Sequence, residues 1–242
     1  QRRTALASSR KSQQNHSPGA PETMKFVHRR SQQDALYFHA IFFAIAIPVA
    51  LYAQNRSLGM AVLGLTLAYN IALPLMCQWR GHREGVRLWM FLLPLSMALP
   101  CADWMLVRQM GTLTFPDHGI YRLGNTVPVY FMGLWIMLLW PLCWHAQTMR
   151  RPYQFIAISA LVAFLIWEWA ARPLHLWHAV NVKQFAGVAL YPLIPEMLLA
   201  VAALWMWRQH GRESLLTRMI CAVSVAVFYA GALSLALLWL NH

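Results

Sequence analysis

The feature that most constrains this chain is a series of long apolar stretches that carry almost no charge. A bilayer core about 30 Å thick is crossed by about 20 apolar residues of helix. Stretches of that kind occupy residues 35–53, 58–78, 88–107, 127–146, 153–171, 187–207 and 215–240. Because lipid offers the backbone no hydrogen bonds, and because the stretches lack the alternation of barrel strands, each is predicted to be helical. The predicted fold class is all-α, a polytopic membrane protein with seven transmembrane helices.

Composition agrees with a membrane chain and excludes several other classes of protein. Charged residues make up 12% of the chain and hydrophobic residues 59%, whereas soluble domains carry about 25% charged residues. The chain holds 12 Trp, 11 Phe and 13 Met, too many large apolar side chains for a disordered or collagen-like chain. No basic stretch is interleaved with base-stacking aromatics, so the net charge of +12 does not indicate a nucleic-acid partner.

The positions of the basic residues predict the orientation of the chain. If successive stretches cross in alternate directions, 15 of the 20 Lys and Arg residues fall on the side of the N-terminus and 5 on the other side. Cytoplasmic loops are enriched in Lys and Arg, so the N-terminus is predicted to be cytoplasmic and the C-terminus outside. We expect a multi-pass protein of the bacterial inner membrane. An organellar membrane is the alternative, because the N-terminal segment is rich in Arg and Ser.

The polar N-terminal segment is predicted to differ from the rest of the chain. Residues 1–34 are expected to form a basic, disordered cytoplasmic tail, and residues 35–242 a seven-helix transmembrane domain. Met24 followed by Lys25 reads as the start of a bacterial membrane protein, so residues 1–23 are interpreted as a start-site extension.

Three carboxylates inside the apolar stretches are the strongest candidates for chemistry. Charged groups at membrane depth are costly, so each normally has a partner or a function. Asp103 and Glu168 are predicted near the outer ends of their helices, and Glu196 about half-way into its helix. All three therefore fall in the outer half of the predicted bundle, and we take Glu196, Glu168 and Asp103 as candidate catalytic residues.

Polar and aromatic residues of the two long outer connections are predicted to complete a ligand-binding mouth around these acids. The candidates are Trp104, Arg108, Asp117, His118, Arg122, Trp169, Arg172, His175, Trp177, His178 and Tyr191. A structural interpretation stays open for two of the acids, because Asp103 with Arg108, and Glu168 with Arg172, could form ion pairs that only join helix ends to loops. Glu196 has no such partner nearby in the sequence.

The regions around Asp103 and Glu168 also resemble two copies of one unit. Each has an acid followed by Trp, then a Gly, then a Pro before an apolar helix; the acid-to-proline separations are 25 residues from Asp103 to Pro128 and 27 from Glu168 to Pro195. This pattern favours an internal duplication of helical hairpins facing one cavity.

No metal site and no known cofactor motif is predicted. His175 and His178 could face one way, but a metal site needs three or four ligands. The four cysteines lie in apolar runs without CxxC spacing and are predicted to be inert buried thiols. No lysine lies inside a predicted span, which excludes a retinal-type Schiff base. The cofactor, if any, is unknown.

The segment that carries Glu168 and Trp169 to Trp177, then Gly187, then Pro195 and Glu196, resembles the heptahelical lycopene cyclase domain. The likeness covers about 60 residues, and the chain is also similar to that family in size, in seven spans and in internal duplication. The family's motif of a proline and paired acids has one acid here, since Met197 follows Glu196. The resemblance implies acid-catalysed cyclisation or isomerisation of an isoprenoid, with Glu196 as the proton donor.

The residues leave three functions open. The first is a protein of the lipid bilayer with an outward-facing acidic and aromatic pocket for a hydrophobic small molecule, an isoprenoid or another lipid. The second is a non-catalytic subunit of a larger complex with membrane-protein partners. The third is a proton-coupled transporter, for which Asn70 and Ser159 would provide polar groups in the inner half.

Overall fold

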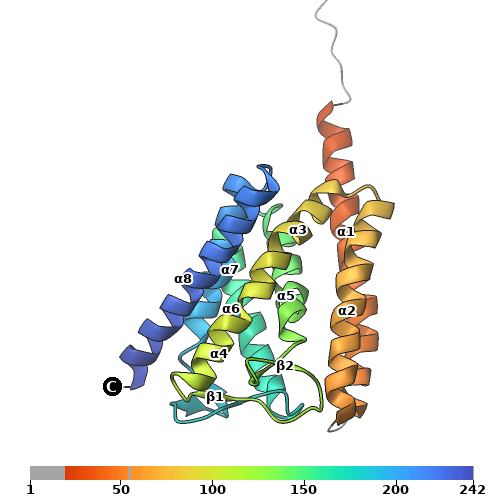
Figure 1. The fold of residues 1–242 in the computed structure, drawn as a ribbon. Coiled ribbons are helices and arrows are strands. Elements are labelled where there is room, and N and C mark those ends of the chain that lie inside the picture. The colour runs from red at the N-terminus through yellow and green to blue at the C-terminus, as the bar shows by residue number, and fades with distance from the viewer. Residues whose placement is uncertain (1–19, 54–55, 242) are drawn as a thin grey trace, which may run out of the picture.

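The computed structural model describes residues 20–53 and 56–241. Its helices stand side by side as a bundle, and short strands gather at one end (Figure 1). Within the described residues, five helical segments are long and apolar enough to cross a membrane: Arg30–Tyr52, Ser57–Trp79, Arg83–Arg108, Pro152–Ala171 and Leu215–Leu240. Several helices of this kind are typical of a multi-pass membrane protein.

The helices follow the predicted apolar stretches. In chain order they are α1 (Ala20–Tyr52), α2 (Arg56–Trp79), α3 (Arg83–Ala98), α4 (Pro100–Arg108), α5 (Phe131–Ala146), α6 (Pro152–Ala171), α7 (Leu193–His210) and α8 (Leu215–Asn241). The stretch 88–107, predicted as one helix, is interrupted at Leu99 between α3 and α4. Pro100 explains the interruption, because it lacks the N–H that would continue the hydrogen-bond ladder.

Six two-residue strands form small antiparallel pairs at one end of the bundle. They are β1 (Leu113–Thr114), β2 (Arg122–Leu123), β3 (Val127–Pro128), β4 (His178–Ala179), β5 (Gln184–Phe185) and β6 (Val188–Ala189). β2 pairs with β3, and β5 pairs with β6, each as a tight hairpin. β1 pairs with β4, with Leu113 opposite Ala179 and Thr114 opposite His178. This pair joins the connection before α5 to the connection before α7.

Two of the predicted helices begin later than their apolar stretches. Residues 127–128 and 188–189, predicted to be helical, belong to β3 and β6. Positive φ angles at Asn125 and Gly187 form the hairpin turns, and Pro128 cannot donate within a helix. As a result α5 has only 16 residues, and α7 has 18 residues that include Glu196 and Arg208. Neither is among the five segments that are long and apolar enough to span.

The N-terminal helix begins inside the segment predicted to be a disordered tail. α1 starts at Ala20, so residues 20–34 are helical, and the predicted boundary after residue 34 is wrong for this part. Polar residues such as Gln32 and Gln33 are good helix formers and simply extend the helix beyond its apolar part. Residues 1–19 of the predicted tail lie outside the described residues.

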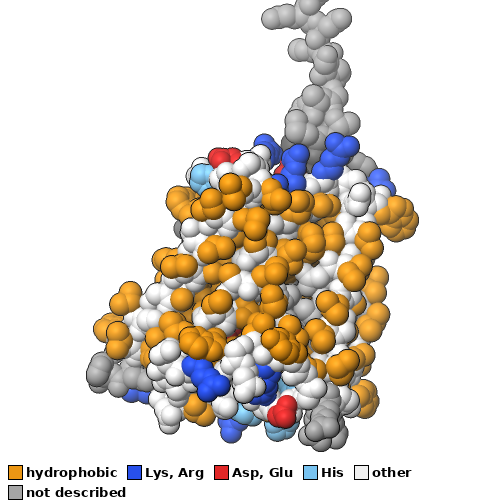
Figure 2. Space-filling view, viewed as in Figure 1, with side chains coloured by type: hydrophobic (Ala, Val, Ile, Leu, Met, Phe, Trp, Pro, Cys, Tyr) orange, Lys and Arg blue, Asp and Glu red, His pale blue; other side chains and the backbone are white. Residues whose placement is uncertain are grey.

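The connections alternate between the two ends of the bundle. The beginning of α1 and the α2–α3 and α7–α8 connections lie at the end opposite the strands, and α8 ends near the strands (Figure 1). Contacts between distant segments bring the α5–α6 connection to the same end as the α7–α8 connection, since Trp207 Nε1 donates to Gln147 Oε1 at 3.2 Å. Figure 2 shows hydrophobic side chains across the middle of the molecule and Lys and Arg at both ends.

Large side chains are fully buried where α3 and α5 meet. Phe91, Leu92 and Leu95 of α3 are fully buried, as is Trp140 of α5. The Trp140 indole N–H donates to the carbonyl oxygen of Gly85 at 3.1 Å, so the largest buried side chain is also hydrogen-bonded. This contact fixes the depth of α5 against α3.

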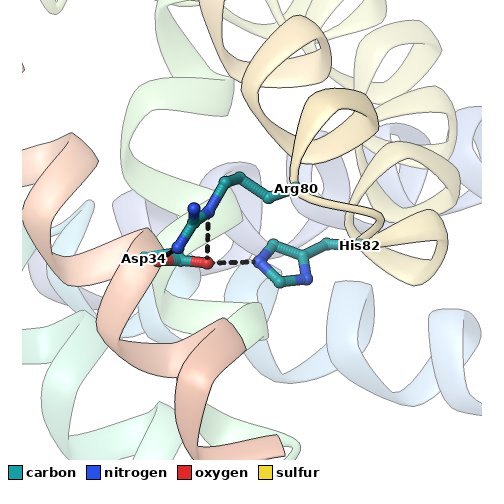
Figure 3. A network of polar contacts seen from close by, with 3 residues as sticks. All are labelled: Asp34, Arg80 and His82. Carbon is teal, nitrogen blue, oxygen red and sulfur yellow. Dashed lines mark hydrogen bonds and ion pairs between the residues drawn. The ribbon is translucent and has the colours of Figure 1, made fainter. Parts of the chain in front are cut away.

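A polar cluster at the end away from the strands joins α1 to the α2–α3 connection (Figure 3). The guanidinium of Arg80 donates to both carboxylate oxygens of Asp34, at 2.9 and 2.7 Å. The His82 ring lies 2.8 Å from Asp34 Oδ2 through its Nε2. The Asp34 side chain is only 13% exposed, and bidentate pairs of this kind are the strongest of the common ion pairs. The cluster therefore anchors α1, whose membrane-spanning part is mostly exposed.

We predict that Asp34→Ala lowers the Tm of the purified protein by about 2–4 °C, the change expected for ~1 kcal/mol in a domain of this size. The reason is that Arg80 and His82 lose their shared partner. Thermal unfolding in one detergent measures the change. Glu84→Gln is the matched control, because the Glu84–Arg87 pair is solvent-exposed and should contribute little. Equal Tm values for the two variants would contradict the anchoring role.

Candidate functional site

A cavity of about 270 Å³ lies in the half of the bundle nearest the strands. Its walls come from α1 and α4 to α8 and from the strand region, and they are mostly apolar and aromatic. The apolar lining residues that enclose it include Leu106, Leu113, Phe115, Phe131, Leu134, Met137, Leu138 and Phe164. Apolar chambers with a few polar groups are the usual form of small-molecule sites.

The three candidate carboxylates all line this cavity. Asp103 comes from α4, Glu168 from α6 and Glu196 from α7. Asp103 is 5% exposed and Glu196 4% exposed, and the three groups are close enough to interact electrostatically. Residues separated by 65 and 28 positions in the chain thus meet at one place.

Two of the carboxyls have an oxygen without a hydrogen-bond partner. Asp103 Oδ2 and Glu196 Oε2 are buried and accept no hydrogen bond from any residue that the structure describes. Glu168 differs, because its Oε1 accepts a hydrogen bond from Trp177 Nε1 at 3.1 Å. Thr66 Oγ1, Ser96 Oγ and Trp144 Nε1 are also buried without a partner among these residues, but they do not line the cavity. Carboxyl groups at membrane depth are the costliest of these polar groups, which makes Asp103 and Glu196 the candidates for function.

The start of α7 sets the position of Glu196. The sequence predicted this residue half-way into its helix, but α7 begins at Leu193, and Glu196 lies in its first turn. The Glu196 N–H donates to the carbonyl oxygen of Pro192 at 2.8 Å, which starts the helical ladder. The positive end of the helix dipole is close by, so a negative charge on Glu196 would be stabilised by about 0.3–1 kcal/mol.

Aromatic side chains surround the acids. Trp177 and Tyr191 were predicted as ligand-binding residues, and both line the cavity. Burial raises the pKa of Tyr191 above its ordinary value, and its hydroxyl lies 3.3 Å from Thr112 Oγ1.

Sequence reasoning missed the other aromatic residues of the lining, among them Trp135, Trp167 and Tyr229, which also carry a polar group. Tyr229 had a usable signal, because it is a polar aromatic residue in the interior of an otherwise apolar helix. The Trp135 indole lies near the Asp103 carboxyl, but its N–H has no partner of good hydrogen-bonding geometry.

Several predicted ligand-binding residues lie elsewhere. Trp169 is 63% exposed on the outer face of α6, and Trp104 packs beside Gly124. Arg108 donates from its Nε to Thr126 Oγ1 at 2.9 Å. Within the described residues, Arg108 forms no ion pair with Asp103, and Arg172 forms none with Glu168, so the interpretation of these acids as helix-to-loop ion pairs is wrong.

A second, polar cavity adjoins the first at Glu168. It also measures about 270 Å³ and is lined by Arg172, His178, Gln184 and Gly187, with Glu168, Trp177 and Ala179 shared by both cavities. Glycine suits position 187 because its φ is +82°, a backbone conformation that other residues rarely adopt. We call this space the vestibule. Asp117 and Arg122 line a separate surface hollow, so the predicted mouth is divided.

His118 joins the loops to the bundle instead of lining the cavity. It is 2% exposed, and its Nε2 donates to the carbonyl oxygen of His175 at 2.9 Å. Its Nδ1 lies 3.2 Å from the Tyr130 hydroxyl. A Cβ at Gly59 of α2 would lie 2.5 Å from the His118 carbonyl oxygen, so glycine permits this close contact. His175, predicted as a ligand-binding residue, contributes here through its backbone.

The four cysteines and the possible metal ligands were also considered in the sequence. Cys77, Cys143 and Cys221 are buried as predicted, but Cys101 is exposed, and all four are free thiols. Among the residues that the structure describes, no group of three or more His, Cys, Asp and Glu side chains could hold a metal ion.

We predict that the folded protein loses stability as the pH falls below 6.5, in part through His118. Burial lowers the pKa of His118 below its ordinary value of 6.5. The unfolded chain then takes up a proton that the folded protein does not, so acid favours unfolding. The Tm of wild type should fall by a few degrees over this range, and His118→Asn should flatten the dependence. An unchanged pH dependence in that variant would contradict this role.

Comparison with protein families gives one match. Residues 100–240 match the model of a family described as a domain of unknown function (DUF6989). No curated protein and no solved structure matches the chain. The matched residues run from the beginning of α4 nearly to the end of α8 and include all three cavity carboxylates. Because the match covers more than half of the 242 residues, the chain belongs to this DUF6989 family.

Proposed function

We propose that this protein binds a hydrophobic ligand, an isoprenoid or another lipid, in the acidic and aromatic cavity and catalyses its acid-dependent cyclisation or isomerisation. The observation that carries the proposal is the pair of buried carboxyl oxygens, Asp103 Oδ2 and Glu196 Oε2, that face an apolar cavity without a protein partner. A merely structural carboxylate at this depth would be expected to have a hydrogen-bond donor or a cation beside it.

The residues of the cavity suit proton transfer to a carbon–carbon double bond. An unpaired ionised carboxylate is costly in an apolar chamber, which favours the neutral acid and makes it a proton donor. Glu196 would donate its proton to one alkene carbon and become a carboxylate beside the positive end of α7. The aromatic faces of Trp135, Trp177 and Tyr229 would stabilise the carbocation by cation–π attraction.

The reaction needs a base as well as an acid. Glu168 is the carboxyl of the three whose oxygen accepts a side-chain hydrogen bond, from Trp177, and it borders the vestibule, so it is the candidate for the base. It would remove a proton from the carbon next to the cation, so that a new double bond forms and no cofactor is consumed. The proton would then return from Glu168 to Glu196, which restores both groups for the next turnover. Asp103 would act as the electrostatic neighbour of both. This reaction class is the one that the resemblance to the heptahelical lycopene cyclase domain implies.

We further propose that α5 and α7 complete a bundle of seven spans, with the strand end outside and the N-terminus in the cytoplasm. The repeated order of elements supports an internal duplication: α4, β1, the β2–β3 hairpin and α5 are followed by α6, β4, the β5–β6 hairpin and α7. The unequal number of basic residues at the two ends supports the orientation.

The two alternative functions have less support. Asn70 and Ser159, the groups considered for a transport route, already form hydrogen bonds within the protein, Asn70 to Gly133 and Ser159 to Phe155. A role as a non-catalytic subunit would give no function to the three carboxyl groups of the cavity. Mass spectrometry of the purified protein separates the functions, since a bound polyene or lipid favours the proposal and stoichiometric partner proteins favour the subunit.

We predict that Glu196→Gln lowers turnover by at least about 100-fold while leaving expression intact, because positioned proton transfer contributes about 10²–10⁴-fold. Membranes with wild type or variant are incubated with a mixture of acyclic isoprenoids, and the extracts are compared by liquid chromatography and mass spectrometry. Cyclisation and isomerisation give products of unchanged mass and altered retention time.

Glu213→Gln is the matched control for this experiment, because Glu213 is exposed and pairs with His210 away from the cavity. The control should convert substrate at the wild-type rate. Full activity of Glu196→Gln would discard the mechanism. A wild type that leaves every isoprenoid unchanged but retains a bound lipid would discard the chemistry and retain the binding.

We predict a graded loss at Trp177. Trp177→Phe keeps an aromatic face but removes the N–H that bonds to Glu168, a hydrogen bond to a charged group worth about 1.5–3 kcal/mol. Turnover should fall by roughly tenfold in Trp177→Phe and further in Trp177→Leu, which also loses the cation–π partner. The same isoprenoid assay measures both variants. Equal activity in all three proteins would contradict a role for Trp177 in the reaction.

A further inference from the structure

The cavity is open at one side of the bundle. Ile166 of α6 lines it and is nevertheless 58% exposed on the outer surface of the molecule. Ala163 and Trp167 on the same helix line the cavity and are half-buried, as are Phe43 of α1 and Leu138 of α5. A side chain that borders both the chamber and the exterior marks the place where the two are continuous. The opening therefore lies beside Ile166, between α6 and the neighbouring parts of α1 and α5.

The exterior at this opening is the apolar surface of a membrane-spanning helix. Val162 is 50% exposed, Leu165 44% and Trp169 63%, all on α6 beside Ile166. Ile166 lies five residues before the end of α6 at Ala171, which corresponds to about 8 Å at 1.5 Å per residue. The opening thus faces the hydrocarbon of a bilayer and not water.

The chamber itself holds only a small ligand. At about 270 Å³ it falls just below the range of about 300–1,000 Å³ that encloses drug-sized molecules. A long-chain lipid cannot fit inside it as a whole, and the rest of its chain must leave through an opening. An apolar chain would leave beside Ile166, because the other exit, the vestibule, is lined by Arg172, His178 and Gln184.

We infer that the opening bordered by Phe43, Leu138 and Ile166 is a lateral portal, through which a long-chain bilayer lipid inserts one end into the chamber while the rest of its chain stays in the bilayer along α6. The identity of the inserted end rests on the proposed function. The portal defines the substrate class as molecules with a long flexible apolar chain. The vestibule gives the acids a separate contact with water at Glu168.

The test uses a thiol placed across the chamber from the portal. Leu106 on α4 lines the chamber and is 4% exposed, so Leu106→Cys can be reached only through the chamber. The variant carries Cys101→Ser, because Cys101 on the same helix is exposed. The protein in liposomes is treated with an N-alkyl maleimide, which partitions into the bilayer, or with a sulfonated maleimide, which stays in water. Peptide mass spectrometry measures labelling at position 106.

We expect the alkyl reagent to label Leu106→Cys faster than the sulfonated one. Adding Ile166→Trp should slow alkyl labelling by about tenfold, which corresponds to ~1.4 kcal/mol on the barrier to entry. Adding Val162→Trp should leave the rate unchanged, because Val162 is exposed on α6 but does not line the cavity. Leu134→Cys on α5, also buried in the lining, is the second reporter if Leu106→Cys does not fold.

Equal labelling rates for the Ile166→Trp and Val162→Trp proteins, or faster labelling by the sulfonated reagent, would overturn the portal. The readout requires no turnover, so the two proposals can fail separately. A protein with the expected labelling and no isoprenoid conversion has the portal without the chemistry. A protein that converts isoprenoids with equal labelling in the two variants has the chemistry without this portal.

Discussion

The absence of hydrogen-bonding groups in lipid is the constraint on which the rest of this structure depends, because every polar group at membrane depth needs a partner in the protein. Several buried polar side chains of this protein meet the requirement. His39 lies 2.7 Å from the Tyr69 hydroxyl through Nε2 and donates from Nδ1 to the Ala35 carbonyl oxygen. Asn70 donates to two carbonyl oxygens and accepts from the Trp89 indole. Asp103 Oδ2 and Glu196 Oε2 are two of eight buried side-chain atoms that lack a hydrogen-bond partner within the described residues, and they differ from the others in belonging to carboxyl groups that line an apolar chamber.

The same constraint decides how much of the fold the sequence could predict. The stretches 58–78, 153–171 and 215–240 agree with α2, α6 and α8 within two residues at each end, because continuous apolar runs correspond directly to helices in lipid. The strands β3 and β6 were missed, because a short apolar run such as residues 127–130 has no period that separates strand from helix. Their hairpins depend on positive φ angles at Asn125 and Gly187, which apolar periodicity does not report.

The types of residue that form the site could be predicted from the sequence, but the direction in which their side chains point could be predicted less well. The three acids could be found because carboxylates are rare and costly at membrane depth. Which side of α6 faces the chamber could not, because that helix is apolar on all sides. Trp167 and Trp169 flank Glu168 symmetrically, each one residue away, or about 100° around the helix. Trp167 lines the chamber and packs against Trp177, whereas Trp169 is 63% exposed, so the sequence-based choice of Trp169 was wrong.

The repeated order of elements explains why the acids meet. In each half, a helix carrying an acid followed by Trp leads into a short strand, and the two strands, β1 and β4, pair antiparallel. This pairing brings the end of α4 next to the end of α6, and therefore Asp103 next to Glu168. The two repeated units differ in their last helix. α7 carries Glu196 in its first turn, whereas α5 begins with Phe131 and contributes aromatic side chains to the cavity wall. A repeated frame with one added acid gives the chamber unequal carboxyls within the described residues: one is bonded to Trp177, and two have an oxygen without a partner. Unequal environments of this kind are what the proposed division into proton acceptor and proton donor requires.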